Sequence, residues 1–462
     1  MERTGARSVH ELSHRGPLAE EVGIACIHER HLTIDPIARW HERLERDPIP
    51  PEEFLREVRA AGAVYGDQPL CVHRRPHFVD QALVKRLTRA IASFHRAIRK
   101  LKKAMLEDGL DGRAGSLVRR MGISEQALEL ARIDPGYGSA AVVARVDCFV
   151  DAGQPRFLEL NAESPAGIGY ADALSAVFER DPLMRSMKAT AFASAPHLVR
   201  AVQESWREWG GSSPPLIAIV DFRDVPTRWE FELLRQTFRA SGVRCEVADP
   251  RDLEFSRGKL VLNGEKVDLV YRRLLVADIL ARPEECKALL DAYRAEAICM
   301  VNSLHTALLH SKGLFALLWD PEYQRVFSAA ERAMIVEHVP WTTVFDAEDP
   351  ELRELALADR DQLVLKPLTG HGGAGVVLGW SCDDESWTRA LDQATAHVLQ
   401  RRVPIEVVPF PDARNGYALH DRVVDLDPFL IRGRFAGLLC RLAAGPMANV
   451  ASGASQVPVF VT

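Results

Sequence analysis

The sequence predicts an α/β protein built from two or three lobes, and three observations support that class. A strand pair is expected in residues 139–161, strands alternate with a helix in residues 215–277, and two apolar strands flank a glycine-rich turn in residues 362–380. Strands and helices in such an order are typical of α/β lobes. A chain of 462 residues exceeds what one ordinary core holds, so we expect it to divide into lobes.

Composition places the chain among globular proteins and limits the classes of partner that we expect for it. Hydrophobic residues make up 47% and charged residues 26% of the sequence, as in ordinary folded domains. The net charge of -6 provides no basic field, so nucleic acid is not expected as a partner. No apolar run approaches the roughly 18 residues that a membrane span needs. The first 17 residues form a polar tail without the apolar segment of a signal peptide.

The cysteines indicate a reduced compartment. All 8 are scattered along the chain, none forms C-x-x-C, and none pairs with a histidine at zinc-ligand spacing. Such thiols are typical of proteins kept away from oxidising surroundings. We therefore expect a cytoplasmic protein without a membrane partner.

The residues ahead of the first strand pair, 18–138, are expected to be mainly helical. In residues 80–105 apolar side chains recur every three or four positions, with lysines and arginines between them. This spacing predicts an amphipathic helix. A solvated basic face is the favoured interpretation of the cations, and a polyanion site the less favoured one.

The second strand of the pair in residues 139–161 carries polar side chains among apolar ones. Strand side chains alternate between two faces, so Phe157, Glu159 and Asn161 are expected on one face. Leu158 and Leu160 are then expected to face the core.

Asp147, on the first strand, adds a second carboxylate to the carboxylate of Glu159 and the amide of Asn161. Mg²⁺ prefers such oxygen ligands and completes its shell with waters and phosphates. A polar strand face open to solvent is the alternative. The loop that follows carries Ser164 and two glycines, and glycine lets a ligand approach the backbone closely.

Residues 211–283 are expected to form a small α/β lobe, in which Arg273 is a candidate substrate ligand. Arg273 follows a short apolar strand, and open α/β sheets bind ligands beyond the carboxyl ends of their strands. An arginine there can hold a substrate carboxylate through two hydrogen bonds. A surface ion pair is an equally favoured interpretation.

The glycine-rich turn in residues 362–380 is a candidate phosphate site. An apolar strand ends at Lys366, four glycines follow, and a second apolar strand returns. The bare amides of such a hairpin can fold over phosphates, while the lysine supplies positive charge. No helix opens at the glycines, so this is neither a P-loop nor a Rossmann fingerprint. A loose hairpin without a ligand is the alternative. The glycines are Gly370, Gly372, Gly373 and Gly375.

Later segments complete the candidate site. A strand is expected at residues 396–403, where backbone groups could meet a purine edge, and successive strands are expected over residues 417–461. Arg441 and Asn449, within these strands, would flank the phosphate region.

Taken together, these parts resemble the ATP-grasp ligases. That family has a phosphate lysine, then a second lysine before a glycine-rich hairpin, an adenine-hinge strand, an arginine with an asparagine turn, and lastly an aspartate about a dozen residues before Glu-x-Asn. Here the acidic set comes first, and this rotated order is similar to the circularly permuted branch, which includes eukaryotic-type glutathione synthetase and glutathionylspermidine synthetase. The resemblance covers residues 139–455. The matching positions on the nucleotide side are Lys312, Lys366, Gly370, Gly372, Gly373, Gly375, Gln400, Arg401, Val403, Arg441 and Asn449.

The resemblance implies a circularly permuted ATP-grasp fold. Its parts would be a polar tail (1–17), a helical region (18–138), a metal-binding part (139–210), a small α/β substrate lobe (211–283) and nucleotide-binding lobes with a lid hairpin (284–462). Asp147, Glu159 and Asn161 would hold Mg²⁺. Glutathione synthetase has a further glutamate ligand where this chain has Gly370, so the number of metal ions stays open.

The activity implied is an ATP- and Mg²⁺-dependent carboxylate–amine ligase that works through an acyl-phosphate. Its substrates would be a small carboxylate and an amine, and a homodimer stays open. Lys366 would neutralise phosphate oxygens, Arg145 or Arg441 would stabilise the transferring group, and Ser164 and Arg273 would contact substrate. Two other classes stay open, namely a small-molecule kinase on the same site and a catalytically silent nucleotide-binding module.

Overall fold

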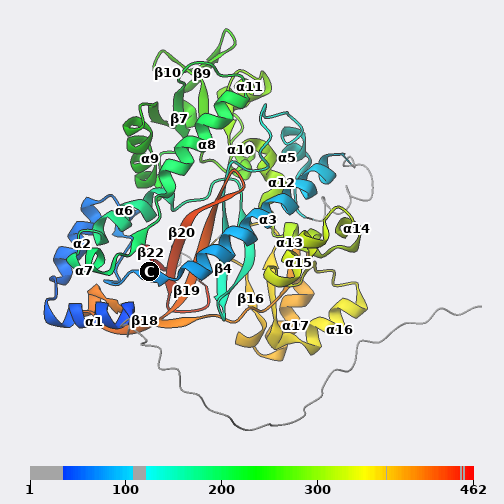
Figure 1. The fold of residues 1–462 in the computed structure, drawn as a ribbon. Coiled ribbons are helices and arrows are strands. Elements are labelled where there is room, and N and C mark those ends of the chain that lie inside the picture. The colour runs from blue at the N-terminus through cyan, green and yellow to red at the C-terminus, as the bar shows by residue number, and fades with distance from the viewer. Residues whose placement is uncertain (1–34, 108–120, 371, 448–449, 451–452) are drawn as a thin grey trace, which may run out of the picture.

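A sheet of six strands forms the centre of the computed structural model, which describes residues 35–107, 121–370, 372–447, 450 and 453–462 (Figure 1). Five strands follow the order β21-β20-β19-β4-β5, and β18 pairs with β19 outside that path. Every pairing is antiparallel. The strands are β4 (Val143–Asp151), β5 (Gln154–Asn161), β18 (Val407–Asp412), β19 (Ala418–Ile431), β20 (Arg434–Ala443) and β21 (Ser455–Val457).

Two tight hairpins set the register of this sheet. Ala152 and Gly153 turn β4 into β5, and Arg432 and Gly433 turn β19 into β20. All four residues have positive φ angles, between 45° and 78°. Two consecutive residues of this kind match the right-handed twist of the flanking strands. The predicted strand pair in residues 139–161 is therefore confirmed.

A β-bulge changes which side chains of β5 face the core. Asp147 pairs with Glu159, but the next residue, Cys148, pairs with Phe157, so Leu158 is an extra residue. Such an insertion interrupts the alternation of a strand. Phe157 is fully buried in the main core, whereas Leu158 lines a cavity. The prediction for these two side chains was wrong, because strict alternation was assumed through the bulge.

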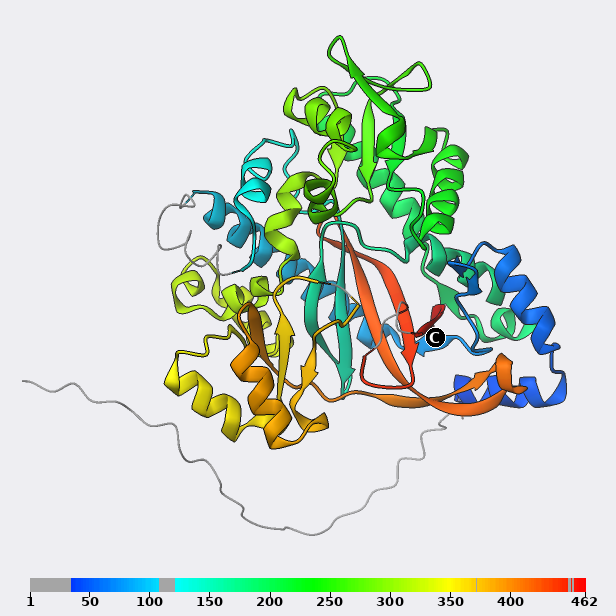
Figure 2. The same ribbon diagram turned by 180° about the vertical axis from the view of Figure 1, so that it is seen from behind.

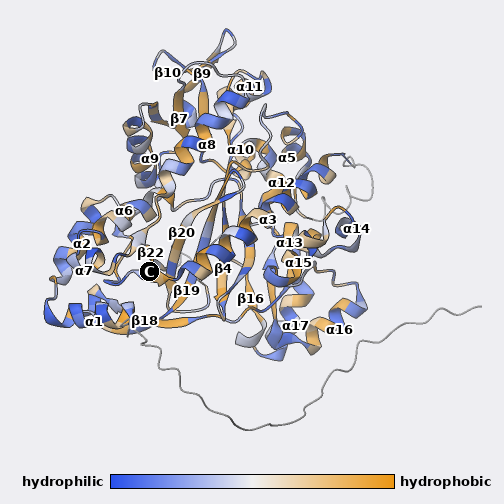
Figure 3. Cartoon of the chain, in the orientation of Figure 1, coloured by the Kyte–Doolittle hydropathy of each residue, from blue (hydrophilic) through white to orange (hydrophobic). Residues whose placement is uncertain are grey.

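The long predicted helix is confirmed as α3 (Gln81–Glu107), which lies across the central sheet (Figure 1). Its apolar stripe, from Leu83 to Met105, is buried in the main core. Its basic residues are partly paired: Lys100 donates to Glu331 of α15 (Ala329–His338) at 2.7 Å, and Arg86 donates to the carbonyl of Gly153 at 2.8 Å. Outer helices such as α3 and α9 show both colours in Figure 3, as amphipathic helices should.

The region before the first strand pair is not wholly helical. The last strand of the chain, β22, lies between β3 and β6 in a separate three-stranded sheet, and β3 belongs to the predicted helical region. Such a short strand is set by its distant partner, which no local pattern can indicate. The elements of this region are α1 (Pro36–Arg46), α2 (Pro51–Ala60), β1 (Val64–Tyr65), β2 (Gln68–Pro69), β3 (His77–Val79) and α5 (Glu125–Leu130). Later elements that lie beside them are α6 (Ile168–Phe178), α7 (Pro182–Met187), β6 (Thr190–Ala191) and β22 (Val459–Val461).

The predicted small lobe contains a parallel sheet in the order β13-β12-β7-β8. Its fourth strand, β13, comes from beyond residue 283. Helices pack on the sheet, as parallel strands require. The elements are α8 (Ser194–Glu208), β7 (Leu216–Val220), α9 (Arg228–Ala240), β8 (Arg244–Ala248), β9 (Leu253–Ser256), β10 (Lys259–Leu262), β11 (Glu265–Val267), β12 (Leu269–Arg272), α10 (Val276–Ala281), α11 (Lys287–Arg294) and β13 (Cys299–Val301).

A second antiparallel sheet, in the order β14-β17-β15-β16, lies beside β4 and β5 (Figure 2). The side-chain amide of Gln400 on β17 donates to the carbonyl of Leu158 on β5 at 3.2 Å, which ties the two sheets together. The elements are α12 (Ala307–His310), α13 (Gly313–Trp319), α14 (Pro321–Gln324), β14 (Thr342–Val344), α16 (Pro350–Ala358), β15 (Leu363–Pro367), β16 (Val377–Leu378), α17 (Asp384–Gln393) and β17 (His397–Arg401).

None of the helices in the described ranges is long and apolar enough to cross a bilayer.

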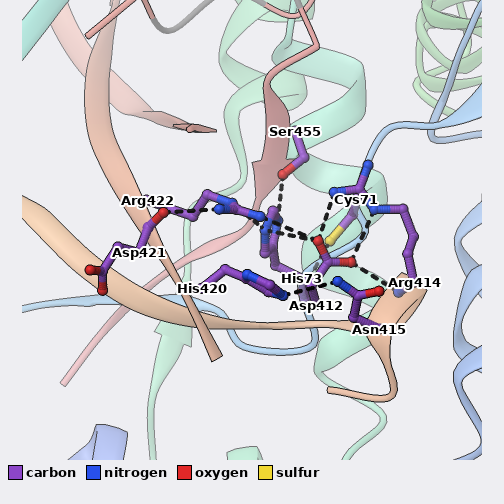
Figure 4. Close-up of polar contacts among 9 residues, drawn as sticks. All are labelled: Cys71, His73, Asp412, Arg414, Asn415, His420, Asp421, Arg422 and Ser455. Atoms are coloured by element: carbon purple, nitrogen blue, oxygen red, sulfur yellow. Dashed lines mark hydrogen bonds and ion pairs between the residues drawn. The ribbon is translucent and has the colours of Figure 1, made fainter. Parts of the chain in front are cut away.

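A buried polar cluster fastens the N-terminal region to the central sheet (Figure 4). Asp412 accepts hydrogen bonds from Arg414 and Arg422, and Arg422 Nε donates to Nε2 of His73 at 3.0 Å. The other ring nitrogen, Nδ1, lies 2.6 Å from Ser455 Oγ. Because Nε2 accepts, Nδ1 carries the proton and donates to Ser455. Burial lowers the pKa of His73, so this cluster joins three distant segments through a neutral imidazole.

Acid is expected to destabilise the protein through His95, which packs against Gly433. Burial, with help from Arg99 and Arg96, lowers the pKa of His95 to about 4, whereas the usual value is about 6.5. Between these values the unfolded chain binds more protons, so the free energy of unfolding falls as the pH falls. Urea denaturation should show that His95→Gln loses about 2 kcal/mol less than the wild type between about pH 7 and about pH 5. Equal losses would contradict this assignment.

Candidate functional site

A cavity between the central sheet and the second sheet gathers most of the predicted site residues. Its wall on the central sheet comes from β4, β5, β19 and β20, and its wall on the second sheet from β15, β16 and β17. The predicted residues that line it are Asp147, Glu159, Lys312, Lys366, Gly370, Gly372, Gly373, Gln400, Arg401, Val403 and Arg441. Segments from both ends of the chain therefore meet at one cavity.

Two lysines contribute positive charge to this cavity. Lys312, just before α13, donates from Nζ to the carbonyl of Gly370 at 2.9 Å and lies 3.4 Å from a carboxylate oxygen of Glu159. Lys366 Nζ, on β15, donates to Gln400 Oε1 at 2.6 Å. Burial lowers the pKa of Lys366 to about 8, against the opposing effect of Glu159. An anion in the cavity would relieve the cost of keeping this ammonium group charged.

The glycine-rich segment is a hairpin, as predicted, with β15 and β16 paired antiparallel. Gly370, Gly372, Gly373 and Gly375 have φ angles between 74° and 110°, a region that other residues rarely adopt. A Cβ atom on Gly373 would lie 2.2 Å from Cε of Met447, which also lines the cavity. The glycines therefore allow the backbone conformation of the hairpin and leave space for a ligand.

Gly373→Ala is expected to weaken nucleotide binding about three- to tenfold, because the added methyl displaces Met447 and strains a positive-φ residue. The matched control is Gly264→Ala, which has a φ of 82° and open space within 4 Å and lies outside the cavity. Calorimetric titration with ADP compares the two variants. Equal affinities for ADP would contradict a role for this hairpin in binding.

The remaining wall of the cavity is largely apolar. The side chain of Gln400 is not free to bind a ligand, because its amide donates to Thr342 Oγ1 at 3.0 Å and to the carbonyl of Leu158. Arg401 pairs with Asp359 at 2.7 Å. The apolar residues are Phe149, Leu158, Val364, Val376, Leu378, Trp380, Val403 and Ile405. Apolar walls with a few convergent polar groups are typical of cofactor sites.

Two acidic residues that sequence analysis did not assign to the site, Asp425 and Asp427, lie close to Asp147, and Asp425 also lines the cavity. One carboxylate oxygen each of Asp147, Asp425 and Asp427 lie within 4.8 Å of one another. Arg441 reaches them all, with Nη2 at 2.7 Å from Asp147, 2.5 Å from Asp425 and 2.9 Å from Asp427. The spacing Asp-x-Asp on one strand places both side chains on one face, which was the available signal. Their approach to Asp147 depends on β19 pairing with β4.

The pKa values of these three carboxyl groups shift in different directions. Burial would raise the pKa of Asp147, but Arg145 and Arg441 hold it well below its usual range. Burial raises the pKa values of Asp425 and Asp427. The two arginines largely neutralise this cluster of three acids, and Asp427 is fully buried.

The residue types predicted to hold Mg²⁺ suit that ion, but in this structure Asp147 Oδ1 accepts from Arg145 and Asp147 Oδ2 accepts from Arg441. Glu159 pairs with Asp147 across the strands, and Asn161 Nδ2 donates to Asp147 Oδ1 at 2.7 Å. Two carboxylates and an amide form an oxygen donor set of the kind that Mg²⁺ prefers. Glu159 is also half-exposed at the cavity, where phosphates could share the ion. The assignment of Asp147, Glu159 and Asn161 to the metal stays a prediction.

Other predicted residues lie outside the cavity lining. Arg145 is buried behind Asp147 and donates to the carbonyl of Ala166 at 3.1 Å. Gly375 lies at the base of the hairpin, where a Cβ would meet Pro367 at 2.8 Å. Ser164 is half-buried in its loop. Asn449 lies outside the described residues.

The side chain of Arg273 forms hydrogen bonds within the protein. Its Nη1 donates to the carbonyl of Pro165 at 2.6 Å, and its Nη2 donates to Glu230 at 3.2 Å. Glu230 in turn accepts from the amide of Gly167 at 2.6 Å. The pair is buried rather than on the surface, which favours a role in holding the 165–169 loop. Substrate contact by Arg273 stays a prediction.

Two sheets around one cavity, with lysines and a glycine hairpin on one and acidic strands on the other, are the arrangement of ATP-grasp proteins. The chain belongs to the circularly permuted ATP-grasp family, because the family description "Circularly permuted ATP-grasp type 2" matches residues 124–451. The resemblance inferred from the rotated motif order is thus confirmed, as is the α/β ATP-grasp fold.

Two curated proteins have sequences similar to this chain. It is 25% identical over 394 residues to an uncharacterized protein of Mycobacterium leprae, covering 79% of this chain and 66% of that protein. It is 30% identical over 136 residues to a Frankia alni protein provisionally named glutamate–cysteine ligase 2-3, covering 28% and 15%. The chain thus spans less than two thirds of the length of these curated relatives.

A solved structure shares the fold at low sequence identity. A glutathione synthetase-like effector from Globodera pallida superposes with a TM-score of 0.62 at 13% identity, covering 94% of this chain and 99% of that chain. The similarity extends beyond the family match to include the N-terminal region.

Proposed function

We propose that this protein is an ATP- and Mg²⁺-dependent carboxylate–amine ligase acting on amino-acid or peptide-like small molecules. The observation that carries the proposal is the single cavity that joins Glu159 and Asp147 to Lys312, Lys366 and the glycine hairpin. The provisional ligase name of the Frankia alni relative supports the same reaction class.

The proposed reaction has two steps. A substrate carboxylate oxygen attacks the γ-phosphorus of ATP, the bond to the β–γ bridging oxygen breaks, and ADP leaves. An amine then attacks the acyl carbon, an amide forms, and phosphate leaves while the amine loses a proton. No covalent bond to the protein is needed.

The chain's own groups would act mainly by charge and position. Lys312 and Lys366 would neutralise phosphate oxygens, which is the main requirement of phosphoryl transfer. Asp147, Glu159 and Asn161 would hold Mg²⁺, which would supply positive charge against the charge that develops on the phosphates. The glycine hairpin would exclude water, which otherwise hydrolyses an acyl-phosphate. Arg441, held by three aspartates, would stabilise the transferring group.

The test measures ADP release from Mg·ATP with a panel of amino acids as acids, in the presence and absence of amine acceptors. Hydroxylamine is included, because it converts an acyl-phosphate to a hydroxamate. Amine-dependent ADP release or hydroxamate formation supports the ligase. A stable phosphorylated product that forms equally without amine indicates the kinase, and nucleotide binding without turnover indicates the silent module.

A further inference from the structure

One face of the second sheet carries three polar side chains from three neighbouring strands. Thr342 on β14 lies directly opposite Gln400 on β17, and Gln400 lies opposite Val364 on β15. Lys366, two residues after Val364, is therefore on the same face as Gln400. Diagonal neighbours of this kind are within reach of long side chains. Lys366 and Gln400 both line the cavity between the two sheets, which is the proposed nucleotide cavity.

A series of hydrogen bonds fixes the orientation of the Gln400 side-chain amide. The hydroxyl of Thr342 donates to the carbonyl of Pro340 at 2.9 Å, so its oxygen is left to accept from Gln400 Nε2 at 3.0 Å. The second acceptor for Nε2 is the carbonyl of Leu158 at 3.2 Å. Leu158 is the extra residue of the β-bulge and has no partner on β4. The amide nitrogen thus faces these two acceptors, and Oε1 faces Lys366.

This amide oxygen orients the ammonium group of Lys366. Nζ donates to Oε1 at 2.6 Å, and among the described residues it has no other hydrogen-bond acceptor. Gln400 is 2% exposed and held on both sides of its amide, so the oxygen keeps a fixed position. An ammonium group has three donors, so two remain for other acceptors. A neutral amide orients the ammonium group without cancelling its charge, whereas a carboxylate would form an ion pair with it.

We propose that Gln400 is a positioning residue, which holds the ammonium group of Lys366 in place for the phosphates of a nucleotide. This role rests on the proposed function, since it needs ATP phosphates in the cavity. The β-bulge contributes to it, because the carbonyl of Leu158 helps to orient Gln400. The alternative is a bond that only joins β15 to β17. The two interpretations differ in how the affinity for ADP depends on pH and on the presence of Lys366.

The first test is Gln400→Met, which removes the acceptor and keeps the length of the side chain. Burial lowers the pKa of Lys366 to about 8, and loss of this hydrogen bond should lower that pKa by about one more unit. Calorimetric titration with ADP should show affinity about threefold below the wild type at about pH 6 and about tenfold or more below it at about pH 8. Comparison at the same pH cancels the titration of ADP itself. An equal loss at both pH values would overturn the proposal.

Gln400→Glu should shift the pH dependence in the opposite direction. The added carboxylate pairs with Lys366 and raises its pKa, while the pair has less charge to offer a phosphate. We expect affinity for ADP about tenfold or more below the wild type at about pH 6, and a decline that begins at a higher pH than in the wild type. The other charged groups that act on Lys366 stay in place in both variants. They are Glu159 on β5, Lys312 before α13, Asp147 on β4 and Asp425 on β19. A decline that begins at a lower pH, as expected for Gln400→Met, would contradict the proposal.

A double-mutant cycle determines whether Gln400 acts through Lys366. In the Lys366→Ala background, Gln400→Met should weaken ADP binding no further, because the group that Gln400 positions is already gone. A further loss of about threefold or more would rule the proposal out.

Thr342 provides a test from outside the cavity lining, because it is 1% exposed and contacts Gln400 alone of the two cavity residues. Thr342→Val removes one partner of Gln400 and should weaken ADP binding about twofold or more at about pH 8, whereas Thr342→Ser keeps the hydroxyl and should match the wild type. Equal affinities of these two variants would overturn the proposal, and the pair keeps the test valid if Gln400→Met does not fold.

Failure of this role and failure of the proposed function give different results. If the wild type bound no ADP, the proposed function would fail, and the role of Gln400 with it. If Lys366→Ala lost affinity but Gln400→Met matched the wild type at both pH values, only the role of Gln400 would fail.

Discussion

Lys366→Ala is expected to lower kcat about 100-fold or more while leaving the protein folded. The lysine supplies a charge at the cavity, where the surrounding protein has a low dielectric constant and the charge acts strongly. The loss should appear in kcat/KM for ATP, because transition-state charge on the phosphoryl group loses its partner. Steady-state ADP release measures the effect, and thermal unfolding checks the fold. An unfolded variant would instead indicate a structural role for the bond to Gln400.

Lys366→Arg is the matched control, because it keeps a positive charge. Burial lowers the pKa of Lys366 to about 8, so in the free protein the charge is lost as the pH rises through that value. The affinity of the wild type for ADP should therefore fall above about pH 8, while an arginine stays charged. A wild-type affinity that is constant up to about pH 10 would contradict this account.

Glu159→Gln is expected to lower turnover about 100-fold or more, with little change in thermal stability. The substitution keeps the shape of the side chain but removes the charge that a bound cation requires. Among the described residues, the half-exposed Glu159 side chain forms one ion pair, with Lys312 at 3.4 Å, and such a pair contributes little to folding. The Mg²⁺ concentration needed for half-maximal ADP release should rise in the variant.

Asp151→Asn is the control for that substitution, because it removes a carboxylate at the end of β4 beyond the nucleotide cavity. Its turnover and Mg²⁺ requirement should match the wild type. If Glu159→Gln behaved like this control, the assignment of Glu159 to the metal would fail.

The local signals in the sequence predicted the elements that carry the site. Periodic apolar residues indicated α3, and the residues around Ala152-Gly153 and Gly370–Gly375 indicated hairpins that the structure contains. These features depend on residues a few positions apart, which is the range over which helical and turn preferences act. The motif order indicated the family, which the match over residues 124–451 confirms.

Contacts between residues far apart in the sequence were not predicted by these local patterns. Asp425 and Asp427 were expected only as strand residues, because their approach to Asp147 needs β19 to pair with β4. The strand β3 was not expected, because its partner β22 lies at the far end of the chain. Arg273 was expected near substrate, yet Glu230 from α9 already pairs with it.

By itself, the sequence determined the class of this protein: the helices, the hairpins, the lysines and acids, and their rotated order along the chain. The tertiary structure alone decided that these side chains face one cavity, that a bulge at Leu158 turns Phe157 into the core, and that three aspartates share Arg441. The physical reason is that strand order and register join residues hundreds of positions apart, and no short pattern contains that information.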